Sequence, residues 1–238
     1  MPLRRNRAAG FDVRHGRVHI VPIGRVHLSA LGNGRSAAIA VSIVMNQRTF
    51  QAGNAHRLDD PQRLVWMPPD EVTGRLDFKP GMVVADIGAG TGFFALPFAR
   101  AVGPEGMVWA VDLQPAMLQI LEEKLQQAGA PGNIGLREGR AADTGLPDGR
   151  CDLTFLGNIW HELDEPGAVL AEMRRILRPG GRVAILDWRT DVPYPPGPPP
   201  EHRVAPSQTQ AMLRGDNWRN VSFRPLGQYS YLLVASAE

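Results

Sequence analysis

From residue 82 onward, short apolar runs alternate with longer segments whose apolar residues recur at helical spacing. The short runs predict strands at 82–87, 107–111, 134–137, 151–156 and 182–187. The longer segments predict helices at 91–102, 115–128 and 166–177. In the helix at 115–128, Met117, Leu121 and Leu125 share one face. Strands that alternate with helices form a parallel sheet with helices on both faces.

The segments that flank this alternation predict three further features. Two apolar runs at 221–226 and 229–235 are separated by Gly227, which predicts a hairpin with an antiparallel edge strand. Residues 59–76 predict a helical entry segment that Pro68 and Pro69 interrupt. The six prolines of 192–200 exclude a helix or a central strand there. That stretch is either a stiff flap over a site or a linker.

Residues 1–44 differ in composition from the rest of the chain. They hold seven arginines against one acid, and they show no sustained helical or strand period. We expect a basic leader or extension that is poorly ordered. Three origins remain open: a targeting leader, a basic arm for nucleic acid, or an upstream extension from a misassigned start codon. A secretory signal does not fit, because no apolar region follows the first charges.

Composition limits the classes of protein that this chain can belong to. Hydrophobic residues make up 43% and charged residues 21%, as in soluble globular proteins, and no apolar run is long enough to span a membrane. The single cysteine, Cys151, excludes a disulfide framework and a cysteine-built metal site, so we expect no metal and a cytoplasmic location. Residues 45–238 carry a net charge of −4, which argues against a nucleic-acid partner.

A glycine-rich loop follows the first predicted strand and precedes a helix. Its glycines are Gly88, Gly90 and Gly92, whereas the dinucleotide fingerprint would require a third glycine at Phe93. Asp86 stands two residues before the loop, where its charge would repel a pyrophosphate. It would attract a ligand with an ammonium and a sulfonium group, and S-adenosylmethionine carries both. Charge complementarity therefore favours this methyl donor over NAD.

The stretch 84–92, with the sequence VADIGAGTG, resembles the first motif of class I S-adenosylmethionine-dependent methyltransferases. The resemblance covers roughly 59–235 and is closest to the small-molecule branch with ubiquinone/menaquinone-biosynthesis and arsenite methyltransferases. It implies an α/β, Rossmann-like, doubly wound, mostly parallel seven-stranded sheet with an antiparallel C-terminal hairpin, in a domain spanning 45–238. Arsenic chemistry does not fit, because that branch relies on several cysteines. The resemblance also implies donor contacts from Asp86, Gly88, Ala89, Gly90 and Gly92.

Residues at the ends of the second and third strands are also expected to contact the donor. Asp112 ends the second strand, where an acid can accept hydrogen bonds from both ribose hydroxyls, and its alternative role is to cap the next helix. Leu113 and Met117 could pack against the adenosine. After the third strand, the resemblance implies that Asp143 accepts from the adenine amine and that the Ala142 backbone contacts the ring. The alternative for Asp143 is a simple loop residue.

The fourth strand is followed by Gly157-Asn158-Ile159-Trp160-His161. The resemblance implies a donor contact from Asn158. The prolines typical of nucleobase amino methyltransferases are absent here, which favours a small-molecule acceptor. His161 is either a general base toward that acceptor or a structural histidine at a helix start, bonded to the backbone or to Glu162.

The sequence thus predicts an enzyme that transfers a methyl group from S-adenosylmethionine to a small molecule. One alternative is a catalytically silent methyltransferase-like binding protein. A weaker alternative is an NAD-dependent oxidoreductase.

Overall fold

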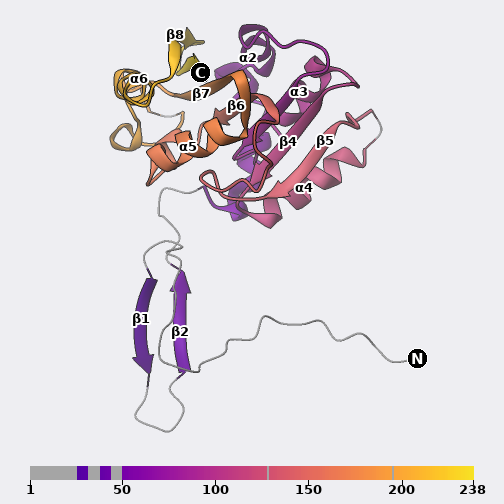
Figure 1. The fold of residues 1–238 in the computed structure, drawn as a ribbon. Coiled ribbons are helices and arrows are strands. Elements are labelled where there is room, and N and C mark those ends of the chain that lie inside the picture. Colours follow the sequence, from indigo (N-terminus) through magenta and orange to yellow (C-terminus); the bar gives the residue numbers. More distant parts are fainter. Residues whose placement is uncertain (1–25, 32–37, 44–49, 128, 195) are drawn as a thin grey trace, which may run out of the picture. The chain divides into compact units, whose positions relative to one another are not determined.

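The computed structural model describes residues 26–31, 38–43, 50–127, 129–194 and 196–238 (Figure 1). The chain divides into two compact units, Met1–Gln47 and Arg48–Glu238. The domain assignment with a boundary at residue 44 stays a prediction, since residues 44–49 lie outside the described residues.

The first unit contains a strand pair that the sequence analysis missed. β1 (Val26–Leu31) and β2 (Ala38–Ile43) pair antiparallel, with Val26 opposite Ile43 and Leu31 opposite Ala38. The expectation of no strand period was therefore wrong for these residues. In VHLSAL a histidine and a serine separate apolar residues, which is the period-2 pattern of a strand, and this short signal was overlooked.

The second unit is built on a seven-stranded sheet with the order β5-β4-β3-β6-β7-β9-β8, so that β5 and β8 are its edges (Figure 1). The strands are β3 (Val83–Ile87), β4 (Met107–Asp112), β5 (Ile134–Glu138), β6 (Cys151–Gly157), β7 (Leu177–Trp188), β8 (Arg219–Leu226) and β9 (Ser230–Ser236). Neighbours from β5 to β7 are parallel, and β9 pairs antiparallel with both β7 and β8. The predicted fold class is confirmed.

Helices cover both faces of this sheet. They are α1 (Arg63–Trp66), α2 (Pro69–Arg75), α3 (Ala95–Val102), α4 (Pro115–Leu125), α5 (Pro166–Ile176) and α6 (Pro206–Gly215), with short 3-10 helices η1 (Ala52–Asp59), η2 (Trp160–Glu162) and η3 (Pro200–His202). Successive strand residues alternate between two cores: Val84 packs with α2 and α3, whereas Ala85 packs with α5 and α6. This two-sided burial explains why the strands are continuous apolar runs.

The strand order reverses beside β3, because β4 lies on one side of it and β6 on the other. In sheets of this kind, ligands bind outside the carboxyl ends of the strands at such a switch point. The glycine loop after β3 stands there.

Three predicted elements have different bounds in the structure. The helix expected from residue 91 begins at Ala95, because Gly90 and Gly92 have positive φ angles of 54° and 87° and keep the loop turning. The turn expected at 178–181 lies within β7, where Gly180 has a φ of 74° and the register against β6 shifts. The entry segment is preceded by η1, which the sequence analysis did not predict.

None of the described helices is long and apolar enough to cross a membrane.

Candidate functional site

The glycine loop after β3 has a backbone that only glycine adopts easily. Gly88 has a φ of 75°, and its amide and that of Ala89 donate to the carbonyl of Val111, at 2.8 and 3.0 Å. A Cβ atom at Gly88 would lie 2.6 Å from the Cδ1 atom of Ile159. The loop is thus held close to β4 on one side and to the segment after β6 on the other.

Asp86 lies beneath this loop with its carboxylate fully enclosed. It is 1% exposed and accepts a hydrogen bond from the backbone of Ala95, while its Oδ2 atom has no hydrogen-bond partner within the described residues. Burial, together with the nearby charge of Asp112, raises the pKa of Asp86 to about 8. A buried carboxylate oxygen without a partner is costly, and a cationic ligand group would satisfy it.

Asp112 connects the glycine loop to the start of α4. Its Oδ2 atom accepts from the amide of Gly90 at 2.8 Å, and its Oδ1 atom accepts from the amide of Gln114 at 2.9 Å. Burial raises the pKa of Asp112, and these backbone donors oppose the shift. Each carboxylate oxygen has a second lone pair, so both oxygens can still accept from a ligand hydroxyl. The helix-start bond and ribose binding are therefore compatible.

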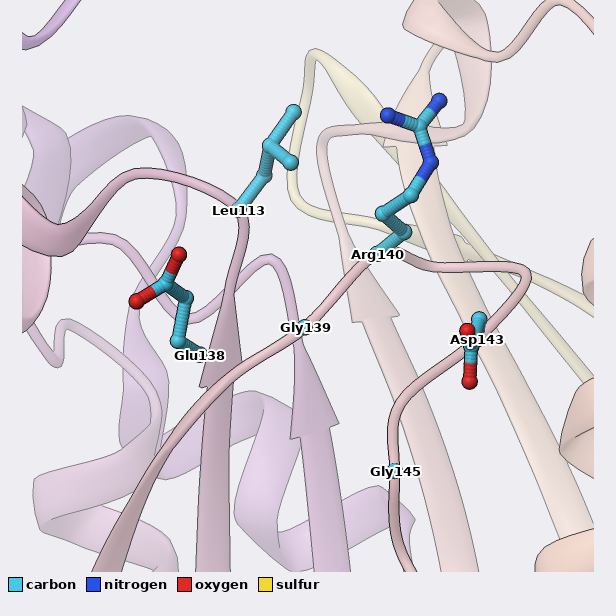
Figure 2. Close-up of a pocket in the computed structure, with 6 residues that line it drawn as sticks. All are labelled: Leu113, Glu138, Gly139, Arg140, Asp143 and Gly145. Atoms are coloured by element: carbon cyan, nitrogen blue, oxygen red, sulfur yellow. The ribbon is translucent and has the colours of Figure 1, made fainter. Parts of the chain in front are cut away.

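A pocket of about 400 Å³ opens beside Asp112, lined by Leu113, Glu138, Gly139, Arg140, Asp143 and Gly145 (Figure 2). Figure 2 shows Leu113 and Arg140 extending in the same direction, while Glu138 and Asp143 lie on opposite sides of Gly139. Leu113, which lines the pocket, is 40% exposed. Met117 is a buried residue of α4 and is not among the residues that line the pocket, so its predicted contact with the adenosine stays a prediction.

The sequence analysis missed Glu138, Gly139 and Arg140 in this pocket. Glu138 is the last residue of β5 and the other two follow it, so the rule that parallel strands end at the same edge of the sheet could have found them. Residues 140 and 143 close a tight turn through two backbone hydrogen bonds of 3.0 Å. Asp143 lines the pocket, and Ala142 is exposed in the turn between them. The adenine contacts of both residues stay predictions.

Asn158 ends β6 in a left-handed conformation, with a φ of 60°. Its amide donates to the carbonyl of Leu186 at 2.8 Å, and its Nδ2 atom lies 2.7 Å from the sulfur of Met67. Its buried Oδ1 atom has no hydrogen-bond partner within the described residues. Like Asp86, Asn158 thus presents an unsatisfied oxygen at the carboxyl edge of the sheet.

His161 is buried on η2 against the end of β7. Its Nδ1 atom lies 2.8 Å from Oδ1 of Asp187, and its backbone amide donates to Oδ2 of the same carboxylate at 2.8 Å. Its Nε2 atom lies 3.9 Å from Oε1 of Glu162. Burial favours the neutral imidazole, but Asp187 and Glu162 outweigh this effect and raise the pKa of His161 above its ordinary value. The proximity of His161 to Glu162 was one of the sequence-based alternatives, whereas its hydrogen bond with Asp187 was not predicted.

The segment 50–67, which we call the cover segment, crosses the same sheet edge. The amide of Phe50 donates to Oε2 of Glu162 at 3.2 Å, and its carbonyl accepts from the side chain of Gln114 at 2.8 Å. Further along, Asp59 accepts from the hydroxyl of Thr91 at 2.8 Å. The cover segment therefore contacts the segments that follow β3, β4 and β6, through Thr91, Gln114 and Glu162.

The proline-rich stretch 192–200 is anchored near the carboxyl end of β7. Because proline has no backbone N–H, the stretch depends on an external donor, and the buried guanidinium of Arg203 serves as that donor. It donates to five carbonyls, those of Arg189, Val192, Pro193, Pro196 and Pro198. Gly197 lies directly on the ring of Trp188 at the end of β7. The described residues of this stretch are thus held by Arg203 and packed against Trp188.

Comparison with known proteins identifies the family. A family profile described as a methyltransferase domain matches residues 85–185. The crystal structure of an S-adenosylmethionine-dependent methyltransferase from Aquifex aeolicus is similar over 80% of this chain and 100% of its own, with 31% identity and a TM-score of 0.75. The chain belongs to the S-adenosylmethionine-dependent methyltransferase family.

Curated members of this methyltransferase family match over a shorter stretch. The ubiquinone/menaquinone biosynthesis C-methyltransferases of Shewanella halifaxensis and Cupriavidus metallidurans are 32% and 36% identical over 110 residues. These residues are 46% of this chain and 44% of each relative. The match therefore spans less than half the length of these relatives.

The residues around the switch point fit the donor of this family. Its sulfonium and ammonium groups are cationic, and the site offers buried Asp86 with an unsatisfied oxygen. Its ribose has two hydroxyl donors, and Asp112 has acceptor capacity on both oxygens. The glycine loop lets the ligand approach the backbone, and the pocket beside Leu113 has the volume for a heterocyclic base.

Replacing Asp112 by alanine should weaken binding of S-adenosylhomocysteine by about 1–3 kcal/mol, because two ribose hydroxyls lose a charged acceptor. Isothermal titration calorimetry measures this change directly. Glu105→Ala, which removes an exposed carboxylate between α3 and β4, is the matched control and should bind as the parent does. An unchanged affinity in the Asp112 variant would leave Asp112 as a residue that only organises the loop and the helix start.

Proposed function

We propose that this protein binds S-adenosylmethionine across the carboxyl ends of β3, β4, β5 and β6 and transfers its methyl group to a small-molecule acceptor. Asp86 and the glycine loop hold the aminocarboxypropyl group, Asp112 holds the ribose, and the pocket at Leu113 and Asp143 receives the adenine. Asn158 contacts the methionine half of the donor. The observation that carries this proposal is the unsatisfied, buried Asp86 carboxylate beneath a glycine loop at the switch point.

We assign His161 as the general base that removes a proton from the acceptor. His161 lies on η2, shortly after β6 and Asn158, and we therefore expect its imidazole to be near the methionine half of the donor, where the methyl group leaves. Transfer is an in-line displacement at the sulfonium methyl, and it depends mostly on how donor and acceptor are positioned. His161 adds proton removal for an acceptor that must lose one.

We expect the acceptor near the carboxyl end of β7, where Trp188 packs against Gly197 of the proline-rich stretch. A small molecule is favoured over a nucleic acid because residues 45–238 carry a net charge of −4 and the segment after β6 lacks the prolines of nucleobase amino methyltransferases. We propose a small molecule that acts in the cytoplasm. The two alternatives, a silent binding protein and an NAD-dependent oxidoreductase, are not favoured by the family or by the buried carboxylate.

Ligand-induced stabilisation tests the donor assignment. S-adenosylmethionine or S-adenosylhomocysteine should raise the melting temperature, because a ligand at 100 times its Kd stabilises the native state by about 2.7 kcal/mol. NAD at the same concentration should leave it unchanged. Differential scanning fluorimetry measures both, and an equal rise with NAD would contradict the charge argument.

Turnover tests the transfer itself. Incubation with S-adenosylmethionine and a panel of phenols, enols, amines and thiols should release S-adenosylhomocysteine with at least one acceptor class. Donor binding without release across the panel would favour the silent binding protein.

A further inference from the structure

Three ionisable side chains meet between η2 and the end of β7, and the geometry gives each of them a different task. We propose that Asp187, His161 and Glu162 form a proton relay: Asp187 sets the tautomer of His161, and Glu162 takes the proton that His161 receives from the acceptor. This inference rests on the proposed methyl transfer. It adds two residues, Asp187 as a positioning residue and Glu162 as the exit for the proton.

The hydrogen bonds of Asp187 determine which nitrogen of His161 carries hydrogen. Its side chain is 0% exposed, and its oxygens accept from the amide of His161 at 2.8 Å and from the amide of Trp188 at 2.7 Å. A carboxylate held by two amide donors is an acceptor only. The Nδ1 atom of His161, 2.8 Å away, must therefore donate to it. The lone pair of the neutral imidazole is then on Nε2.

Glu162 is placed to receive a proton from that Nε2 atom. Its Oε1 atom lies 3.9 Å from Nε2, and its Oε2 atom accepts from the amide of Phe50 in the cover segment. The Glu162 side chain is 14% exposed, compared with 8% for His161, so it is the member of the pair nearer to solvent. Burial raises the pKa of Glu162 to about 7, close to the range of an imidazole, which makes proton transfer between the two nearly balanced.

Other charged groups around this cluster act on it in opposite directions. Arg203, which follows η3, lowers the pKa of His161, whereas Asp187 on β7 and Glu162 on η2 raise it. Asp112, at the end of β4, raises the pKa of Glu162, whereas His161 lowers it. The nearness of Asp112 also means that the relay borders the donor site.

In this relay, His161 removes a proton from the acceptor as the methyl group is transferred. The bond between the acceptor atom and its hydrogen breaks, and the proton goes to Nε2 of His161. The electron pair left on the acceptor forms the new bond to the methyl carbon, and the bond from sulfur to that carbon breaks with its electrons remaining on sulfur. The products are methylated acceptor and S-adenosylhomocysteine. The imidazolium then gives the Nε2 proton to the Glu162 carboxylate, which releases it to water.

Nitrogen NMR of the histidine rings tests the tautomer without any acceptor. The chain has six histidines, and His161→Asn identifies the signal of His161 by its loss. In the parent protein we expect neutral His161 with hydrogen on Nδ1. In Asp187→Asn we expect this preference to be lost and the pKa of His161 to fall. The matched control is Asp191→Asn, an exposed carboxylate paired with Arg189. Hydrogen on Nε2 in the parent protein would overturn the role of Asp187.

Glu162→Gln keeps the shape of the side chain and keeps the proposal testable where Asp187→Asn fails to fold. We expect the pKa of His161 to fall while its tautomer stays the same. With an acceptor that turns over, kcat should fall roughly 10-fold or more with the Kd for S-adenosylhomocysteine unchanged. Glu165→Gln, on the exposed start of α5, is the control. An unchanged kcat in Glu162→Gln would overturn the exit role, although methyl transfer would still stand. If none of the phenols, enols, amines and thiols releases S-adenosylhomocysteine, methyl transfer would be overturned. The NMR experiment would still decide which nitrogen of His161 carries the hydrogen.

Discussion

His161→Asn should lower turnover by roughly 10²–10⁴-fold while the Kd for S-adenosylhomocysteine stays nearly unchanged, because asparagine cannot act as a base near neutral pH. The amide of asparagine still offers a group that can hydrogen-bond to Asp187, which lies 2.8 Å from the imidazole. His161→Ala removes both functions and serves as the comparison. Steady-state kinetics with detection of S-adenosylhomocysteine, together with calorimetry for the donor, separates chemistry from binding.

The pH dependence of turnover in the parent enzyme also tests whether His161 is the general base. The base must be neutral, so kcat at saturating donor and acceptor should rise with pH and level off above the pKa of His161, which lies above its ordinary value of about 6.5. This rise should be absent in His161→Asn. Full activity in the asparagine variant would make His161 a structural residue that only ties η2 to β7. The base would then be the acceptor itself, solvent or another group.

Hydrophobic patterning predicted most of the fold for a physical reason. Central parallel strands are buried on both faces, so β3, β4, β6 and the second half of β7 are largely apolar runs, and their helices carry one apolar face. The boundaries that failed depend on backbone conformations of single glycines. Gly92 delays α3, and Gly180 lets β7 continue through a predicted turn.

The site residues that could be predicted are those that stand at or shortly after the end of a predicted strand in the sequence. Asp86, the glycine loop, Asp112 and His161 all have this position. Contacts between distant residues were not predictable in the same way. Asp187 is 26 residues from His161, and the amide of Phe50 is 112 residues from Glu162. No local sequence pattern indicates either contact. The contact between His161 and Asp187 arises because β6 and β7 are neighbours in the sheet, and the contact between Phe50 and Glu162 arises because the cover segment lies against η2.

Binding of S-adenosylhomocysteine at pH 7 should release close to one proton from the protein, because its ammonium group requires an ionised Asp86. With a pKa of about 8 in the ligand-free protein, roughly nine in ten Asp86 carboxyls are protonated at pH 7. The cation displaces this proton, so affinity should increase as the pH rises toward 8. Titration calorimetry in buffers of different ionisation enthalpy counts the released protons.

Asp86→Asn tests whether this carboxylate is the source of the proton. The variant cannot release a proton at position 86, and it leaves the ammonium without a buried counter-charge. We expect affinity at pH 8 to fall by roughly 2–5 kcal/mol, about 30-fold to several thousandfold, as for other buried charge pairs that lose one partner. Asp70→Asn, on the exposed first turn of α2, is the control and should match the parent. Asp112 is the neighbouring acid of the proposed donor site, and burial raises its pKa as well. Persistent proton release in Asp86→Asn would move the linkage from Asp86 to Asp112, and an unchanged affinity would remove Asp86 from the donor site.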